Sequence, residues 1–151
     1  MMGKATILDE IVANRRREVA QRKQALPEEF LARRARTMKP VRDFAGTLRR
    51  ENGGPPNVIA ELKRASPSKG CIREDFRVVS LARELAAGGA SALSVLTEKH
   101  YFRGGHRNLR IAADVVSIPL LCKDFIVETY QLCEARVYEA DAALLILAAL
   151  A

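Results

Sequence analysis

The sequence predicts an α/β fold with a parallel sheet, preceded by a helical segment. From residue 58 onward, apolar runs of strand length alternate with helical patterns. These runs recur roughly every 25–35 residues, the size of one strand–helix unit. They are almost continuously apolar, as expected for strands that are covered on both faces.

The first fifty residues show helical spacing instead of strand-like runs. An apolar stripe predicts a helix over residues 6–24. Pro27 is tolerated in a first turn and two acidic residues follow it, so a second helix is expected from there to about Arg36. The Gly, Pro and Asn residues that come later then separate a helical extension, residues 1–50, from a second part, residues 51–151.

The second part is expected to begin with a strand and to alternate regularly. The predicted strands cover residues 58–63, 92–96, 118–122 and 143–147. Apolar stripes at helical spacing follow the first three strands. The first of these helices is expected to stop at Gly88 and Gly89, which suit a helix C-terminus, and the third is expected over residues 129–140.

Two architectures fit this alternation, an open doubly wound sheet and a (β/α)8 barrel. No strand is followed by a G-x-G-x-x-G turn, which disfavours the dinucleotide-binding form of the open sheet. Charged side chains at the carboxyl ends of strands favour the barrel, whose active sites lie there. Complete barrels have about 250 residues, so we expect these units to be the truncated first half of a barrel. A half-sized domain that dimerises is the alternative.

The charged residues of the first and third strands are the candidate catalytic groups. Glu61 and Lys63 share one face of a strand about 6.5 Å apart, so both can reach one small molecule. The alternative is a structural ion pair. Lys123 ends the third strand and can act as a general acid; the alternative is a surface lysine paired with Asp124.

Loop residues next to these strands are candidates for substrate binding. Ser66 lies in a loop with hydroxyls, a cation and a glycine, which suits an anionic ligand. Phe102 and Phe125 follow the second and third strands and can wall an aromatic pocket, or else pack in the core. His100 and His106 have no spaced partner, so we expect both at the surface, and no spacing indicates a metal site.

The formal charge of +7 comes from the first third of the chain. Residues 1–50 carry 13 Lys and Arg against 6 Asp and Glu, and the remainder carries 12 of each. A basic segment can bind nucleic acid or lipid, but interleaving with acidic and apolar residues favours a solvated helix face. Without a signal peptide, a spanning segment or patterned cysteines, the sequence indicates a cytoplasmic protein without nucleic-acid or membrane partners.

One segment identifies a family. Residues Ile59 to Gly70, Ile-Ala-Glu-Leu-Lys-Arg-Ala-Ser-Pro-Ser-Lys-Gly, resemble the signature of indole-3-glycerol-phosphate synthases almost residue for residue. Residues 92–98 and 119–126 are similar to the family's second and third strands. The N-terminal helices resemble the extension that precedes the barrel in this family, so the resemblance covers essentially the whole chain.

The resemblance implies a (β/α)8, or TIM, barrel that acts as a decarboxylating carbon–carbon lyase of tryptophan biosynthesis. Its reaction closes the indole ring of 1-(2-carboxyphenylamino)-1-deoxyribulose 5-phosphate, with loss of carbon dioxide and water and with no cofactor or metal. By position, Lys123 resembles the general acid, Lys63 the cation that holds substrate anions and assists ring closure or dehydration, and Glu61 its orienting partner. The residues that the resemblance assigns to phosphate and to the anthranilate ring are Ser66, Phe102 and Phe125.

The sequence departs from the family pattern in two respects. Cys122 stands where an arginine is common, but strand alternation points it away from Lys123. The family's general-base glutamate on the fifth strand and its later phosphate loops have no counterpart, so we expect the 151-residue chain to be inactive. A full-length form is expected to be a monomer or fused to another tryptophan-pathway domain.

Three other functions are compatible with parts of the sequence. A phosphoribosylanthranilate isomerase shares the expected fold, but the Glu-x-Lys and Lys-Asp-Phe segments argue against it. A half-barrel fragment that folds only with a partner and a basic nucleic-acid-binding module are the other two alternatives.

Overall fold

The computed structural model describes residues 6–50 and 53–150. Its helices are α1 (Ile7–Ala25), α2 (Glu28–Arg36), α3 (Phe44–Thr47), α4 (Val78–Ala87), α5 (His106–Ala113), α6 (Thr129–Val137) and α7 (Leu147–Leu150). Its strands are β1 (Ile59–Leu62), β2 (Ala65–Ser66), β3 (Gly70–Cys71), β4 (Ala92–Leu96), β5 (Leu120–Lys123) and β6 (Ala142–Ala143). Among the described helices, none combines the length and apolar character needed to cross a membrane.

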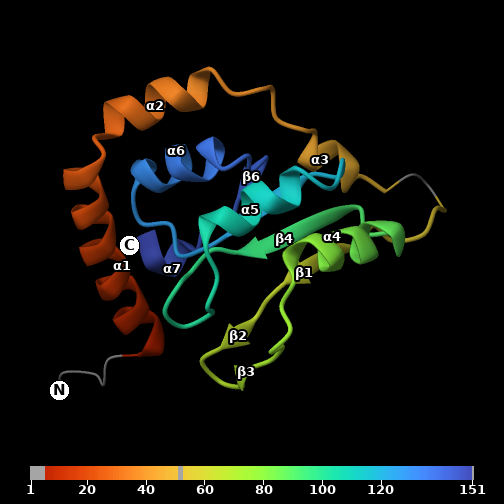
Figure 1. Ribbon diagram of the computed structural model, residues 1–151, viewed down its shortest axis with the longest axis horizontal. Coiled ribbons are helices and arrows are strands. Elements are labelled where there is room, and N and C mark those ends of the chain that lie inside the picture. The colour runs from red at the N-terminus through yellow and green to blue at the C-terminus, as the bar shows by residue number, and fades with distance from the viewer. Residues whose placement is uncertain (1–5, 51–52, 151) are drawn as a thin grey trace.

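The central sheet is parallel, and its strand order β1-β4-β5-β6 follows the order of the chain (Figure 1). The alternation of strands and helices confirms the predicted α/β class and agrees with part of a (β/α)8 barrel. The register aligns Glu61 with Ser94 and Leu121 in one row across three strands. Because residues in register point to the same face of a parallel sheet, this row lies on one face and the next row on the other.

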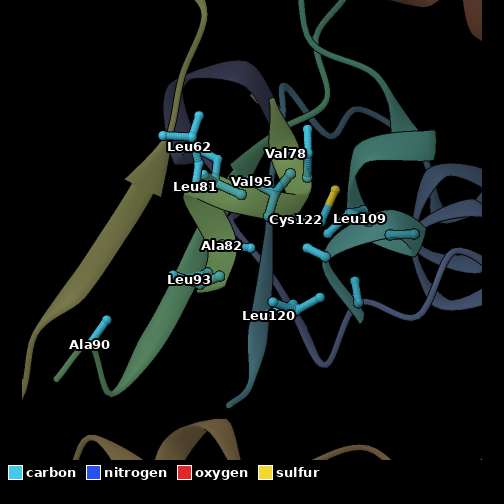
Figure 2. Close-up of a cluster of buried hydrophobic side chains, with 13 residues drawn as sticks. Leu62, Val78, Leu81, Ala82, Ala90, Leu93, Val95, Leu109, Leu120 and Cys122 are labelled. Atoms are coloured by element: carbon cyan, nitrogen blue, oxygen red, sulfur yellow. The ribbon is translucent and has the colours of Figure 1, made fainter. Parts of the chain in front are cut away.

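The main hydrophobic core lies between the sheet and the helices that follow its strands. Leu62, Val95 and Cys122 form the row next to Glu61 and are at most 2% exposed. Figure 2 shows them packed with Leu81 of α4 and Leu109 of α5. The opposite face carries Glu61, Ser94 and Lys123 together with apolar residues such as Leu96.

The N-terminal helices wrap around the outside of α6 (Figure 1). Val19 of α1, Leu31 of α2 and Tyr130 of α6 form a second buried cluster. An ion pair, Arg22 Nε to Glu134 Oε1 at 2.8 Å, joins α1 to α6 beside this cluster. Part of the positive charge of the first third of the chain is therefore neutralised inside the fold.

The prediction of a fourth strand over residues 143–147 is correct only at Ala143. The strand β6 ends at Ala143, and Leu147 begins the short helix α7 instead of ending a strand. Leu144 N donates to Cys122 O at 3.1 Å, and sheet pairing ends there. The sequence Leu-Ala-Ala-Leu that follows favours a helix because alanine has the highest helix propensity.

The loop after β1 is more ordered than the sequence suggests. Ala65–Ser66 and Gly70–Cys71 pair as an antiparallel hairpin, β2 and β3. The chain reverses direction before Gly70, whose φ of +63° is a conformation that glycine adopts without strain. This hairpin projects from the carboxyl end of β1 (Figure 1).

Candidate functional site

The candidate site lies at the carboxyl ends of β1 and β5. Glu61 and Lys63 come from β1 and the residue after it, and Lys123 is the last residue of β5. Parallel strands end at the same edge of a sheet, which brings these three charged side chains together although 60 residues separate Lys63 from Lys123 in sequence.

Glu61 is the centre of the site. Its Oε1 lies 3.0 Å from Lys63 Nζ, and its Oε2 accepts a hydrogen bond of 3.1 Å from Lys123 Nζ. Ser94, the buried neighbour of Glu61 in the sheet, donates its hydroxyl to Oε2 at 3.1 Å. Burial pushes the pKa of Glu61 upward, but the hydrogen bonds from the two lysines outweigh it and leave the pKa below its ordinary value. The site therefore holds an anion between two cations.

The alternative for Lys123, a surface lysine paired with Asp124, is wrong. Asp124 is buried and faces α1, where Arg15 Nε donates to its Oδ1 at 2.9 Å and Arg15 Nη2 pairs with its Oδ2. Thr97 also donates to Asp124. Lys123 instead points to Glu61 and keeps 37% of its side chain exposed, so its ammonium group is accessible to a ligand.

Phe102 and Phe125 face each other beside the lysines. Their ring centroids are 6.0 Å apart and the rings are tilted by 39°. Both rings line a cavity of about 670 Å³ together with Lys63 and Ser66. The cavity thus has an aromatic wall and a cation next to each other, and both phenylalanines are at the cavity surface rather than wholly in the core.

Ser66 lines the same cavity as Lys63. It belongs to β2, and its Oγ accepts a hydrogen bond from Lys69 N at 3.2 Å. The hairpin therefore brings Ser66 and Lys63 to one cavity, although Lys63 directly follows β1 and Ser66 belongs to β2.

One part of the cavity lining is not indicated by the sequence. Ile7, Leu8 and Ile11 of α1 also line the cavity. Their helical stripe indicates only that α1 buries an apolar face, and nothing in a single sequence says that this face covers a cavity.

The two histidines differ in their environment. His100 is 57% exposed, as predicted, and its Nε2 lies 2.6 Å from Glu18 Oε1. The prediction of a surface position holds only in part for His106, which is partly buried and whose ring stacks on Tyr138 with centroids 5.4 Å apart. Burial lowers the pKa of His106 to about 4, so the imidazole is neutral at pH 7.

One group of side chains in the described part of the chain has ligand atoms close enough for a metal ion. His106, Cys122 and Asp124 place these atoms within 4.8 Å of one another. Burial raises the pKa of the Cys122 thiol to about 12, and a metal requires the thiolate. Because Arg15 already holds the Asp124 carboxylate, the group does not fit a metal site.

Known proteins with similar sequences belong to one family. The sequence pattern of the family described as "Indole-3-glycerol phosphate synthase" matches residues 8–151. Proteins named indole-3-glycerol phosphate synthase from Acidithiobacillus ferrooxidans and Laribacter hongkongensis are each 48% identical over 145 residues, which cover 95% of this chain and 55% of each relative. A protein of the same name from Burkholderia multivorans is 50% identical over the same share of both chains.

These relatives are longer than the chain. The chain spans about half the length of the curated relatives that it matches. The match extends through the strand carrying Glu61, the strand carrying Lys123 and the N-terminal helices, and the chain therefore belongs to the indole-3-glycerol phosphate synthase family.

Proposed function

We propose that this chain supplies one side of the active site of an indole-3-glycerol-phosphate synthase. The reaction closes the indole ring of 1-(2-carboxyphenylamino)-1-deoxyribulose 5-phosphate, with loss of carbon dioxide and water. The observation that carries the proposal is the carboxylate of Glu61 between two lysines, next to a pair of aromatic rings. Such a cluster suits a substrate that joins an aromatic acid to a phosphorylated sugar.

Each charged residue has a part in this proposal. Lys123 is the general acid that protonates the ketose carbonyl or the departing hydroxyl, for which its exposed ammonium group is suitably open. Lys63 holds the substrate's anionic groups and assists ring closure or dehydration. Glu61 orients both lysines through the contacts described above.

The remaining predicted residues bind the substrate. Phe102 and Phe125 pack against the anthranilate ring, and the cavity between them and α1 offers about 670 Å³. Ser66, which lines the same cavity, contacts the phosphate. We propose no cofactor or metal, because general acid catalysis and charge stabilisation suffice for this reaction, and we place the enzyme in the cytoplasm.

A nucleic-acid-binding role is less well supported. It requires free cations in the basic first third of the chain. Part of this charge is already neutralised, because Arg15, Arg22, Lys23 and Arg42 are paired with carboxylates of the second part of the chain. We therefore propose a small phosphorylated substrate as the ligand, and neither nucleic acid nor membrane as a partner.

A chimaeric enzyme tests the proposal. Residues 1–151 are joined to the part of the Acidithiobacillus ferrooxidans relative that lies beyond the matched region, and formation of indole-3-glycerol phosphate is measured. We expect turnover in the chimaera, and loss of turnover when Lys63 is replaced by methionine. A Lys39→Met variant is the matched control, because Lys39 is exposed and lies outside the cavity. A folded chimaera without activity would contradict the proposal.

A further inference from the structure

The loop after β4 is built around a buried carboxylate. The side chain of Glu98 is completely buried, with 0% exposure. Burial of an ionised group is costly unless other groups satisfy it. Among residues 6–50 and 53–150, no lysine, arginine or histidine forms an ion pair with Glu98, so its partners must be found elsewhere.

Three consecutive backbone amides take the place of a cation. His100 N donates to Oε1 at 2.9 Å, and Tyr101 N and Phe102 N donate to Oε2 at 2.6 and 3.0 Å. Hydrogen bonds from amides to a charged acceptor are stronger than those to a neutral one. Glu98 thus holds residues 100–102 in a fixed arrangement around its carboxylate.

The far end of the same loop is fixed against β4. Gly104 N donates to Glu98 O at 2.7 Å. A β-carbon on Gly104 would lie 2.2 Å from Leu96 O, so only glycine allows this close approach. The loop is therefore anchored at both ends, and its path depends on the carboxylate in the middle.

Phe102 is the last of the three residues whose amides donate to Glu98. Its amide is the third donor to Glu98, and its ring lines the cavity opposite Phe125. We propose that Glu98 is a positioning residue that sets the place of the Phe102 ring and so shapes the pocket for the aromatic ring of the substrate. This inference rests on the proposed function for the identity of the ligand, but the ordering of the loop does not depend on it.

The contacts on the outer side of the loop provide a control. Tyr101 Oη donates to Glu10 Oε1 at 2.8 Å, which joins the loop to α1. A Tyr101→Phe variant removes this contact and leaves the three amide bonds to Glu98 in place. A Glu98→Gln variant keeps the side-chain shape but removes the charge and one acceptor oxygen.

The test uses the isotope-labelled 151-residue chain and nuclear magnetic resonance. In the unaltered chain, the amide protons of residues 100–102 are expected to be shifted downfield and protected from exchange. In Glu98→Gln, protection at these three amides is expected to fall by about tenfold or more, roughly the effect of losing one hydrogen bond to a charged group. Contacts between the Phe102 and Phe125 rings should weaken with it, while Tyr101→Phe leaves both unchanged.

Binding of anthranilate, titrated by the same method, connects the loop to the ligand. We expect Glu98→Gln to weaken it by about tenfold and Tyr101→Phe to leave it unaltered. If the unaltered chain does not bind anthranilate, the proposed function fails this test, while the amide signals still decide the role of Glu98.

Two results would overturn the proposal. One is rapid exchange of the amides of residues 100–102 in the unaltered chain, which needs no variant and so does not depend on a variant's folding. The other is a Glu98→Gln chain with intact β4 and α5 signals in which the Phe102–Phe125 contact is unchanged.

Discussion

Among the candidate residues, Glu61 forms the most hydrogen bonds and ion pairs within the site. It contacts Lys63, Lys123 and Ser94 through two oxygens, so the positions of both lysines depend on it. A ligand that carries its own carboxylate or phosphate can compete with Glu61 for these lysines. The cluster therefore has a resting arrangement in which the lysines are held in place for an anionic substrate.

Removal of the ammonium group of Lys123 tests its role directly. In the chimaera, Lys123→Met is expected to lower kcat by about 10²- to 10⁴-fold, the usual contribution of a general acid. Steady-state formation of indole-3-glycerol phosphate measures the effect, with Lys39→Met as the control. A kcat within a factor of two or so of the unaltered value would mean that Lys123 does not transfer the proton.

Local patterns in the sequence predict candidate site residues but not the partners of their neighbours. Alternation along a strand suffices to place Glu61 and Lys63 on one face. The partner of Asp124 is Arg15, which is 109 positions away in the sequence. One sequence contains no signal for such a distant pairing, and for the same reason the stacking of His106 on Tyr138 could not be predicted.

Among the elements, α2 contributes to stability through one side only. Leu31 is 4% exposed in the cluster with Val19 and Tyr130, whereas its neighbour Phe30 is 58% exposed. Leu31→Ala is expected to lower the free energy of unfolding by about 2–5 kcal/mol because it leaves a cavity. Phe30→Ala is expected to change it by less than about 0.5 kcal/mol.

Urea denaturation of both variants measures the two values. Both substitutions replace an apolar side chain in the same helix by alanine, so their effects on helix propensity are similar. Equal losses in the two variants would show that α2 does not pack on α6 as described.

The contact between α5 and the end of α6 makes stability depend on pH. His106 has its pKa lowered by burial from 6.5 to about 4. The unfolded chain therefore binds a proton below pH 6.5 that the folded chain does not bind until about pH 4. The stability that this residue contributes is complete above pH 6.5, decreases as the pH falls towards 4, and then levels off, with a total loss of about 3 kcal/mol.

A variant isolates this effect from the titration of carboxylates. His106→Phe keeps an aromatic ring against Tyr138 but cannot titrate. Free energies of unfolding measured between pH 7 and pH 4 are expected to decrease more steeply in the unaltered chain than in His106→Phe. Parallel curves for the two chains would contradict the desolvated, neutral state of His106.

The sequence predicts the elements well where they are long or bounded by clear signals. The strand at residues 92–96 and the helix stop at Gly88 agree with the structure because apolar runs and glycines mark them. The end of the fourth strand could not be predicted, because a short apolar run fits a strand and a helix equally well. The β2–β3 hairpin was missed because its strands have only two residues each.

Within the whole molecule, the described part of the central sheet has an edge strand at each end. Among the described strands, β1 and β6 each pair on one side only. Ile59 at one side is 42% exposed, and Leu147 beyond the other is 85% exposed. Exposed edges and apolar residues of this kind favour association with further strands.

The described part of the site also contains no carboxylate that is free to accept a proton. Glu61 is shared by two lysines and Asp124 is held by Arg15. We therefore expect no turnover by the 151-residue chain alone, and recovery of turnover when it is mixed with the separately produced remainder of the Acidithiobacillus ferrooxidans relative. Formation of indole-3-glycerol phosphate by the chain alone would contradict this expectation.

The order of the sheet also determines how the molecule can form during synthesis. Because β1, β4, β5 and β6 are neighbours in the order in which they are made, each strand finds its partner already present on the nascent chain. The cluster of Leu31 and Tyr130 is different, since roughly 100 residues separate its two halves, or about 5–20 s of translation. For that interval α1 and α2 have left the ribosome without the surface that they cover, and they close onto the molecule only after α6 has been made.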